Sequence, residues 1–289
     1  MQSYLYFPGC SLRTVAKPFD ASAKACARAL GTDLKEMQGW LCCGAVCSNT
    51  SDNLMTQAGP NRILARAQAE GNSLVTLCAG CYNVLKRTSI QAKRNRERQE
   101  RINDFNEEPF TGDVNVLHLL EVLRDFVGFD TIREKVKIRL QGLPVGAYYG
   151  CLLLRPSREM QLDDPHRPTV IEDLLESTGC APVEYPSRTE CCGSYLSVPS
   201  PETIQRLSGA IVKSARSNGA KLIAVSCPLC KYNLELSQAH EPEPMPIVYF
   251  TQLLGIALGL SKQDLELDDL HYQTIRSNLQ APMEGVVKQ

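Results

Sequence analysis

Short apolar runs, each reaching a cysteine, predict the strands of this chain. In the first half these runs are "YLYF", shortly before Cys10, and "SLVTLC", ending at Cys78. In the second half they are "VGAYY", shortly before Cys151, and "LIAVSC", ending at Cys227. Apolar runs of roughly four to eight residues are typical of buried strands. We therefore expect each of these strands to place a cysteine at or near its end.

Between the runs, apolar residues recur at helical spacing. The pattern predicts helices over residues 18–31, 59–72 and 200–220. The last two segments have proline near the start and glycine or asparagine near the end, as helices often do. Strands that alternate with helices indicate a parallel sheet, in which ligands lie at the carboxyl ends of the strands.

Each half also ends in a further apolar helix, predicted over residues 116–128 and 247–259. Before the first of these lies an insertion, residues 91–108, in which ten of eighteen residues are charged. We interpret the insertion as a solvated helix that continues the preceding "CYNVLKRT" helix, with a docking arm for another subunit as the alternative. The polar residues from Ser261 onward are expected to wrap the surface or a partner.

The cysteines reveal an internal repeat of the form C…CCG…CxxC. Cys78 follows Cys43 by 35 positions, and Cys227 follows Cys192 by 35 positions. Only the first interval differs between the halves, and the eight extra residues of the second half are expected within "RPSREMQLDDPHRP". Ten of the 13 cysteines follow the pattern: Cys10, Cys42, Cys43, Cys78 and Cys81, then Cys151, Cys191, Cys192, Cys227 and Cys230.

This repeat predicts an α/β fold of two pseudo-symmetric Rossmann-like halves. Each half is expected to be a small parallel sheet flanked by helices, with cysteine ligands at strand ends. The junction falls near "LQGLPVG", so the predicted domains are residues 1–143 and residues 144–289, the second with a C-terminal tail.

Length and composition exclude several classes of protein. A chain of 289 residues can bury a core without disulfides, and the opening "MQSYLYFPGC" lacks a signal-peptide pattern, so we expect a reducing cytoplasm. No apolar segment approaches the roughly 20 residues of a membrane-spanning helix, which argues against direct membrane insertion. Acidic and basic residues nearly cancel, at 32 against 31, which argues against nucleic-acid binding.

Five repeating cysteines per half limit what the chain can bind. A structural zinc takes four ligands, yet each half has a single CxxC and the four histidines do not recur at equivalent positions. Zinc is kept as an alternative. Ordinary iron–sulfur clusters also take four thiolates. Adjacent Cys42 and Cys43 project in different directions, and Gly44 lets the backbone turn close to a ligand. We therefore hypothesise an inorganic core that is larger or more open than a compact cube.

Three cysteines lie outside the repeat. Cys26 falls among alanines on a predicted amphipathic helix, and Cys180 opens a predicted strand, so both are expected in the core. Cys47 lies four residues beyond Cys43 and has no cysteine counterpart in the second half, which leaves its role open.

The doubled CCG pattern, together with "YFPGCSL" and "YYGCLLLRP", resembles the B subunit of heterodisulfide reductase in its bacterial form, over nearly the whole chain. The resemblance implies two noncubane [4Fe-4S] clusters that face a shared substrate cavity. By the same resemblance each cluster has five thiolate ligands. The first set is Cys10, Cys42, Cys43, Cys78 and Cys81, and the second is Cys151, Cys191, Cys192, Cys227 and Cys230.

The resemblance also implies a reaction and partners. Two clusters that flank one S–S bond could each deliver one electron to a small disulfide or a protein persulfide. No catalytic residue beyond the cluster ligands is assigned, although Tyr149, Tyr195, Lys231 and His166 lie near motif cysteines in the sequence. Family relatives receive electrons from a C-type subunit with cubane [4Fe-4S] clusters and a flavin-containing A-type subunit. This chain itself lacks a GxGxxG fingerprint after a strand.

A second hypothesis has the same ligands and a different task. The clusters could relay electrons within a larger oxidoreductase, such as a methylenetetrahydrofolate reductase or a hydroxyacid oxidase, without disulfide chemistry of their own. The third is the structural zinc protein.

Overall fold

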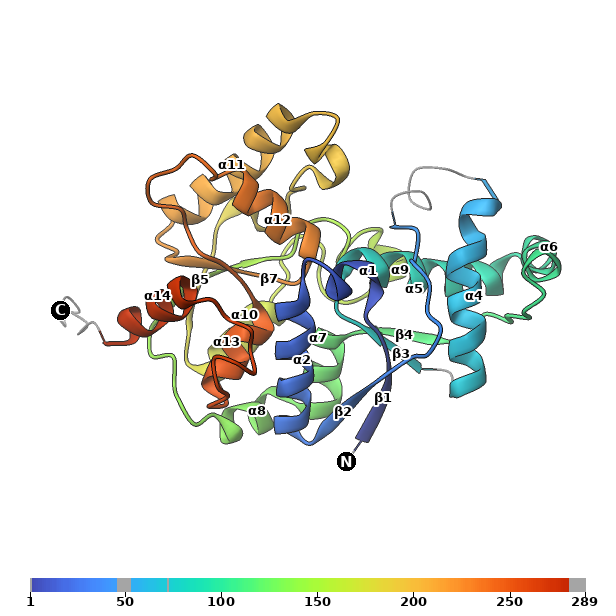
Figure 1. Cartoon of the computed structure of the whole chain (residues 1–289), viewed down its shortest axis with the longest axis horizontal. Coiled ribbons are helices and arrows are strands. Elements are labelled where there is room, and N and C mark those ends of the chain that lie inside the picture. The colour runs from blue at the N-terminus through green and yellow to red at the C-terminus, as the bar shows by residue number, and fades with distance from the viewer. Residues whose placement is uncertain (1, 46–52, 72, 281–289) are drawn as a thin grey trace.

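Two parallel four-stranded sheets form the framework of the computed structural model, which describes residues 2–45, 53–71 and 73–280 (Figure 1). The first sheet has the order β2-β1-β3-β4 and the second the order β6-β5-β7-β8, so the two halves share one topology. The strands are β1 Gln2–Phe7, β2 Thr32–Glu36, β3 Ser73–Thr76, β4 Asn115–His118, β5 Pro144–Tyr148, β6 Ala181–Val183, β7 Leu222–Val225 and β8 Ile247–Tyr249. The predicted fold class is confirmed.

Helices connect the strands in both halves. In the first half they are α1 Gly9–Arg13, α2 Lys17–Leu30, α4 Met55–Glu70, α5 Ala79–Arg94, α6 Arg96–Asn106, α7 Leu119–Glu121, the π-helical turn η1 Val122–Val127 and α8 Phe129–Lys135. In the second half they are α9 Ser157–Met160, α10 Val170–Thr178, the 3-10 turns η2 Pro186–Thr189 and η3 Ser194–Ser197, α11 Pro201–Ser217, α12 Pro228–Leu236, α13 Phe250–Ala257 and α14 Asp269–Gln280. The division into residues 1–143 and 144–289 stays a prediction.

The predicted helices over 18–31 and 200–220 are confirmed as α2 and α11. The helix predicted over 59–72 begins earlier, at Met55, so Pro60 lies inside it and does not mark its start. The reason is a polar contact upstream of the proline: the side-chain oxygen of Asn53 accepts a hydrogen bond from the Met55 amide at 3.0 Å. A free amide at the helix start is thereby paired before Pro60 is reached.

The apolar segments 116–128 and 247–259 were predicted to be helical from their first residues, and this is wrong. Each begins with an edge strand, β4 or β8, and only then turns into a helix. The strands form because Val116 and Leu117 pair with Leu74 and Val75 of β3, an interaction between distant segments that local periodicity does not contain. Strand β2 was likewise absent from the prediction.

The charged insertion is only partly as predicted. Helix α5 ends at Arg94, and a second helix, α6, follows after Asn95, where we expected a continuous helix. Helix α6 is held by buried amides, since Gln99 Nε2 donates to Asn61 Oδ1 at 2.7 Å and Asn106 Nδ2 donates to the Ala58 carbonyl at 2.9 Å. One face of the insertion is therefore part of the structure of this chain.

Helices α2 and α13 join the two halves, and they lie side by side in Figure 1. The ring of Phe19 stacks on Tyr249 with centroids 4.2 Å apart and meets Phe250 edge-on at 5.7 Å. The hydroxyl groups of Ser22 and Thr251 are 2.7 Å apart. The hydrophobic core is accordingly continuous from one half to the other.

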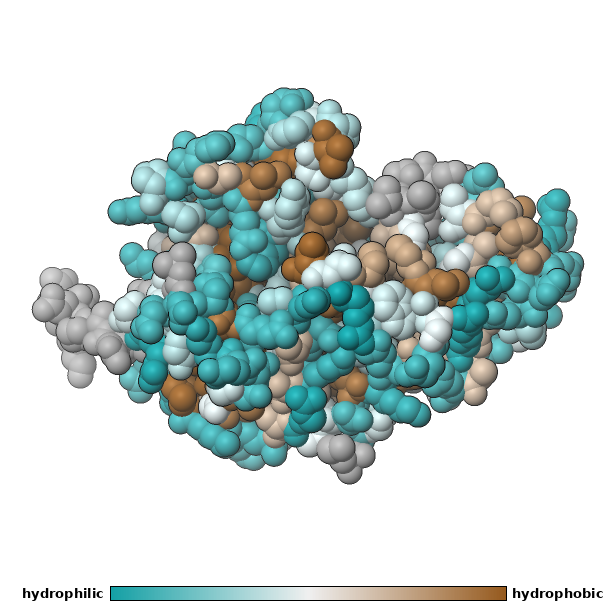
Figure 2. All heavy atoms as spheres, viewed as in Figure 1, coloured by the Kyte–Doolittle hydropathy of each residue, from teal (hydrophilic) through white to brown (hydrophobic). Residues whose placement is uncertain are grey.

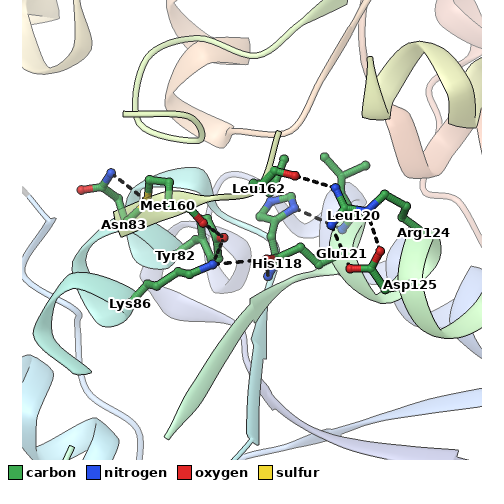
Figure 3. A network of polar contacts seen from close by, with 10 residues as sticks. All are labelled: Tyr82, Asn83, Lys86, His118, Leu120, Glu121, Arg124, Asp125, Met160 and Leu162. Atoms are coloured by element: carbon green, nitrogen blue, oxygen red, sulfur yellow. Dashed lines mark hydrogen bonds and ion pairs between the residues drawn. The ribbon is translucent and has the colours of Figure 1, made fainter. Parts of the chain in front are cut away.

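Strand β4 ends at His118, whose buried ring joins two strand ends of the first sheet. Its Nε2 is 2.8 Å from the Leu77 carbonyl, and its Nδ1 accepts a hydrogen bond from the Leu120 amide at 3.2 Å. Figure 3 shows this ring beside a polar network in which Lys86 reaches the Tyr82 hydroxyl at 2.6 Å and Glu121 at 3.2 Å. The two bonds of the ring require a neutral imidazole with the proton on Nε2.

The burial of His118 predicts a loss of stability in acid. Burial lowers the pKa of His118 from 6.5 to about 4. The unfolded chain therefore binds this proton more tightly, and stability is lost as the pH falls from 6.5 towards 4, by up to about 3 kcal/mol. We expect His118→Asn to remove this part of the pH dependence. Denaturant unfolding at pH 8, 6 and 5 measures it, and identical pH profiles for wild type and variant would contradict the account.

Candidate functional site: two groups of five cysteines

The motif cysteines lie at the carboxyl ends of the sheet strands, as the sequence predicts. Cys10 falls in α1, directly after β1, and Cys78 lies between β3 and α5. Cys151 follows β5, and Cys227 lies between β7 and α12. Equivalent strands of the two sheets thus carry equivalent cysteines.

In the first half the thiols meet in pairs. The sulfur atoms of Cys10 and Cys42 are 3.9 Å apart, and those of Cys43 and Cys81 are 3.2 Å apart. Cys78 lies within hydrogen-bonding reach of Cys81. All five predicted residues of the first group are therefore brought together, with Cys10 and Cys42 exposed to solvent.

The second half repeats this arrangement with less exposure. The sulfur atoms of Cys151 and Cys191 are 3.8 Å apart, which matches the Cys10–Cys42 pair. Cys230 lies within hydrogen-bonding reach of both Cys192 and Cys227. None of these five cysteines is exposed. The two groups have the same internal pairing and different access to water.

The two groups also meet each other. The thiols of Cys78 and Cys227, the first cysteines of the two CxxC motifs, lie within hydrogen-bonding reach across the boundary between the halves. Figure 2 shows the surface hollowed between the part that carries α12 and the part that carries α1 and α4, with hydrophobic side chains inside the hollow.

Glycines let the backbone pass close to the sulfur atoms. Gly9 and Gly150, which precede Cys10 and Cys151, have φ angles of 74° and 63°. A Cβ atom at Gly9 would be 3.0 Å from the Cys81 sulfur, and one at Gly150 would be 3.1 Å from the Cys230 sulfur. A side chain at either position would enter the space of the thiols.

The two CCG glycines, Gly44 and Gly193, supply a matched pair of mutants. Both have positive φ, 66° and 96°, but a Cβ at Gly193 would be 2.4 Å from Ile204 Cδ1, whereas one at Gly44 meets no atom of the described residues within 4 Å. We expect Gly44→Ala to lower the free energy of unfolding by about 1 kcal/mol through backbone strain alone. Gly193→Ala should lower it by about 2–4 kcal/mol, since overpacking is added. Equal losses in denaturant titrations would refute this reading.

Proton sharing links the thiols. A hydrogen bond from Cys42, with a second from Cys81, lowers the pKa of Cys43 to about 5. A hydrogen bond from Cys151 lowers the pKa of Cys191 to about 6. The pKa of Cys151 is raised by the same contact. The pKa of Cys43 or Cys191 is therefore low only while a neighbouring thiol keeps its proton. All five thiols of a group can be ionised together only if a cationic centre binds them.

The four polar residues that lie near motif cysteines in the sequence have different positions. Tyr149 is buried and donates to Glu172, Lys231 binds Glu235 and the Ile247 carbonyl, and His166 is exposed. Tyr195 is half-buried on η3 and interacts electrostatically with Cys227, Cys78 and Cys43. Among the four, Tyr195 lies beside cysteines of both halves.

Two asparagines of this region, Asn83 and Asn233, were not identified from the sequence. Each lies in the first turns of a CxxC helix and is fully buried. Asn233 Nδ2 donates to the carbonyls of Cys192 at 3.3 Å and Ser194 at 2.9 Å, and lies 3.4 Å from the Cys192 sulfur. The signal available in the sequence was the Tyr-Asn pair that follows each CxxC motif, Tyr82-Asn83 and Tyr232-Asn233.

The cysteines outside the repeat are placed as expected where the structure describes them. Cys26 is buried, and its thiol donates to the Thr251 carbonyl at 3.2 Å. Cys180 is buried directly before β6, which confirms both its core position and the predicted strand. Cys47 lies outside the described residues.

A single-ion site finds no support in the described part of the chain. Over residues 2–45, 53–71 and 73–280, no group of three or more histidine, cysteine, aspartate or glutamate side chains is placed to hold one metal ion. The thiols converge in pairs instead. The zinc alternative therefore lacks the compact set of four ligands that it needs.

The repeated sheet and the repeated cysteine groups define a two-domain cysteine-rich protein, and comparison with known families agrees. The family described as "CCG: Cysteine-rich domain" matches twice, over residues 4–86 and 145–235. The chain belongs to this family of cysteine-rich domain proteins.

Named relatives extend over almost the whole chain. It is 31% identical, over 92% of its length and 96% of the relative, to the 8-methylmenaquinol:fumarate reductase membrane anchor subunit of Wolinella succinogenes. It is 28% identical, over 93% of both chains, to the B subunit of the ferredoxin/F(420)H(2)-dependent CoB-CoM heterodisulfide reductase of Methanosarcina acetivorans. The B subunit of the ferredoxin:CoB-CoM heterodisulfide reductase of Methanosarcina mazei is 26% identical over 95% of both. The similarity to the heterodisulfide reductase B subunits is thereby confirmed.

The fold is also found among solved structures. A hypothetical protein from Helicobacter pylori superposes with a TM-score of 0.74 at 14% identity, covering 93% of this chain and 51% of that one. No helix among the described residues is both long and apolar enough to cross a membrane.

Proposed function

We propose that the chain is an iron–sulfur subunit that carries electrons within an oxidoreductase complex. One noncubane [4Fe-4S] cluster would be held by each group of five cysteines. The observation that carries the proposal is the meeting of two complete cysteine groups at Cys78 and Cys227. Two redox centres that close together can act on one bound molecule.

The residues present fit such a group. The sulfur atoms of Cys10 and Cys42 lie 3.9 Å apart, and those of Cys151 and Cys191 lie 3.8 Å apart. Each half thus repeats the same thiol pair beside three further cysteines, and thiolates are the ligands that iron–sulfur clusters take. The amides of Gly44 and Gly193 each lie 3.4 Å from a thiol, Cys42 or Cys191, where they can donate hydrogen bonds to an anionic sulfur.

The reaction we propose is the two-electron reduction of a small disulfide or a protein persulfide. A disulfide takes up two electrons and two protons as its S–S bond breaks, and it yields two thiols. When bound, the clusters would supply the electrons one at a time and favour the thiolate form of the products. The chain itself contributes the hollow between the halves, the thiolate ligands and the glycines that leave room for them.

The electrons must come from other subunits. We propose a C-type subunit with cubane [4Fe-4S] clusters as donor, which a flavin-containing A-type subunit supplies in turn. The heterodisulfide reductase relatives are named as B subunits, which supports assembly with other subunits. We also place the complex in the cytoplasm, because free thiols persist in a reducing compartment.

A disulfide titration tests the proposed reaction. The anaerobically purified, dithionite-reduced protein is mixed with a small disulfide, and the absorbance of the clusters and the released thiols are followed. We expect reoxidation with two thiols released per disulfide. Clusters that stay reduced would reject disulfide reduction and leave electron relay as the function.

The relay is the second candidate, and the fumarate reductase relative favours it. Its name describes the membrane anchor subunit of a reductase that acts on a menaquinol and fumarate. In that case the chain would pass electrons between a membrane quinol and a soluble catalytic subunit. A methylenetetrahydrofolate reductase or a hydroxyacid oxidase complex would be another enzyme in which the chain could act as a relay. Reduction of the clusters by a menaquinol analogue, with no response to disulfides, is the expected result.

A further inference from the structure

Helix α5 of the first half reaches across to the second cysteine group. Its first turn lies next to Cys78 and contains Cys81, both of the first group, while its following turns contact a segment of the other half. That segment, residues 152–160, follows Cys151 directly and ends with α9; we name it the strap. The strap includes part of the sequence in which the second half is longer than the first.

Asn83 makes the central contact. Its Nδ2 donates to the carbonyl of Leu152 at 2.8 Å and to the carbonyl of Arg155 at 2.7 Å, and lies 3.3 Å from Met160 Sδ. An amide group has two N–H donors, so both are used on the strap. Asn83 is fully buried, and water is therefore not at hand to replace these bonds.

Neighbouring residues of α5 support the same contact. The Tyr82 hydroxyl donates to the Met160 carbonyl at 3.1 Å, and Figure 3 shows both side by side with Asn83. A Cβ at Gly80, between the two CxxC cysteines, would lie 3.9 Å from Leu152 Cδ1. On the surface, Glu159 forms ion pairs with Arg87 at 3.5 Å and with Arg94 at 3.4 Å.

The corresponding asparagine of the second half does not bind a carbonyl of the first half. Asn233, the buried asparagine of the other CxxC helix, donates to Cys192 and Ser194 of its own half. Cys10, the counterpart of Cys151, is exposed. The two groups therefore differ in construction: Cys151 is anchored through Leu152 by Asn83 of the other half, whereas Asn233 bonds carbonyls of its own half.

We propose that Asn83 is a positioning residue for the second cysteine group, holding the strap so that Cys151 faces Cys191. Its effect on iron at that group rests on the function proposed above. Although Asn83 lies in the first half, its replacement acts on the second group. Asn83→Asp tests this directly, because it keeps the shape of the side chain and replaces the NH2 group that donates both hydrogen bonds with a carboxyl oxygen facing the same carbonyl oxygens.

The test compares the intact, anaerobically purified protein with Asn83→Asp and two further variants. Asn106→Ala is the matched control, since it removes a buried amide that donates to a carbonyl of its own half, that of Ala58, and not to the strap. Glu159→Gln is the mild variant, which weakens only the surface pairs of the strap. Hydrogen exchange of the strap amides and the iron bound per chain are measured for each.

We expect strap exchange about tenfold faster in Asn83→Asp, a smaller increase in Glu159→Gln and none in Asn106→Ala. Asn83→Asp should also lose about half of the iron, and its remaining spectrum should match that of a Cys151→Ala/Cys191→Ala variant. Unchanged strap exchange overturns the proposal, as does full iron content or a spectrum like that of Cys10→Ala/Cys42→Ala. A wild type without iron would reject the proposed function alone, because strap exchange still decides the role of Asn83.

Discussion

Replacing Cys10 and Cys42 together with alanine is expected to remove about half of the iron and acid-labile sulfide bound by the chain. These two sulfurs are the close pair of the first group, 3.9 Å apart, and the remaining three thiols would leave part of a cluster without ligands. The second group has its own five cysteines and should keep its iron. Disulfide-driven reoxidation should fall to background, because the reaction needs two electrons and one centre carries one at a time.

The control removes the same number of thiols from the core. Cys26→Ala/Cys180→Ala deletes two buried cysteines that lie outside both groups. It should retain all of the iron and sulfide and keep disulfide-driven reoxidation, with stability lowered by about 1–2 kcal/mol. Iron analysis of the two double variants is decisive: equal iron contents would show that the motif cysteines do not hold the metal.

Phe19→Ala is expected to cost about 3–5 kcal/mol of folding free energy. Phe19 is completely buried, stacks on Tyr249 and meets Phe250 edge-on, so its ring fills the junction between α2 and α13. Its loss leaves a cavity where the two halves join. Since Tyr249 lies at the carboxyl edge of the second sheet, the separation between the cysteine groups should also become less well defined.

The matched control is Phe105→Ala on α6. Phe105 is 58% exposed, so its removal should change stability by less than about 0.5 kcal/mol. Denaturant titration of both variants measures the difference. A Phe19→Ala protein as stable as wild type would show that the two halves do not depend on this aromatic contact.

The cysteine repeat carried most of what could be predicted from the sequence. Strands β1, β3, β5 and β7 were predicted because each is an apolar run that leads to a cysteine, and the fold class followed from their alternation with helices. Parallel topology then brought the cysteines to one edge, as expected. The repeat spacing thus encodes both the fold and the candidate site.

The edge strands show where local patterns fail. The sequence predicts that residues 116–118 and 247–249 begin apolar helices. In the structure they form β4, which pairs with β3, and β8, which pairs with β7. A strand three or four residues long has no period of its own, and its pairing partner lies far away in the sequence. Strand β2, with the five-residue polar sequence "TDLKE", was missed because Leu34 is its single apolar residue and no apolar run marks it.

The contacts between the halves were also out of reach of sequence reasoning. The extra residues of the second half were expected to begin at Arg155. Nothing in the sequence indicated that the Arg155 carbonyl would bind Asn83, about 70 positions earlier. In the insertion at residues 91–108 the helix is interrupted at Asn95, because the buried amides of α6 form hydrogen bonds with groups of α4. In both cases a polar side chain finds its partner in a segment that folding brings close.

X-ray diffraction from anaerobically grown crystals, recorded on both sides of the iron absorption edge, tests the central claim most directly. The account predicts two separate groups of iron peaks, one beside Cys10, Cys42, Cys43, Cys78 and Cys81 and the other beside the second five cysteines, facing each other across Cys78 and Cys227. Iron absent from both positions, or a single peak at the zinc edge, would contradict it.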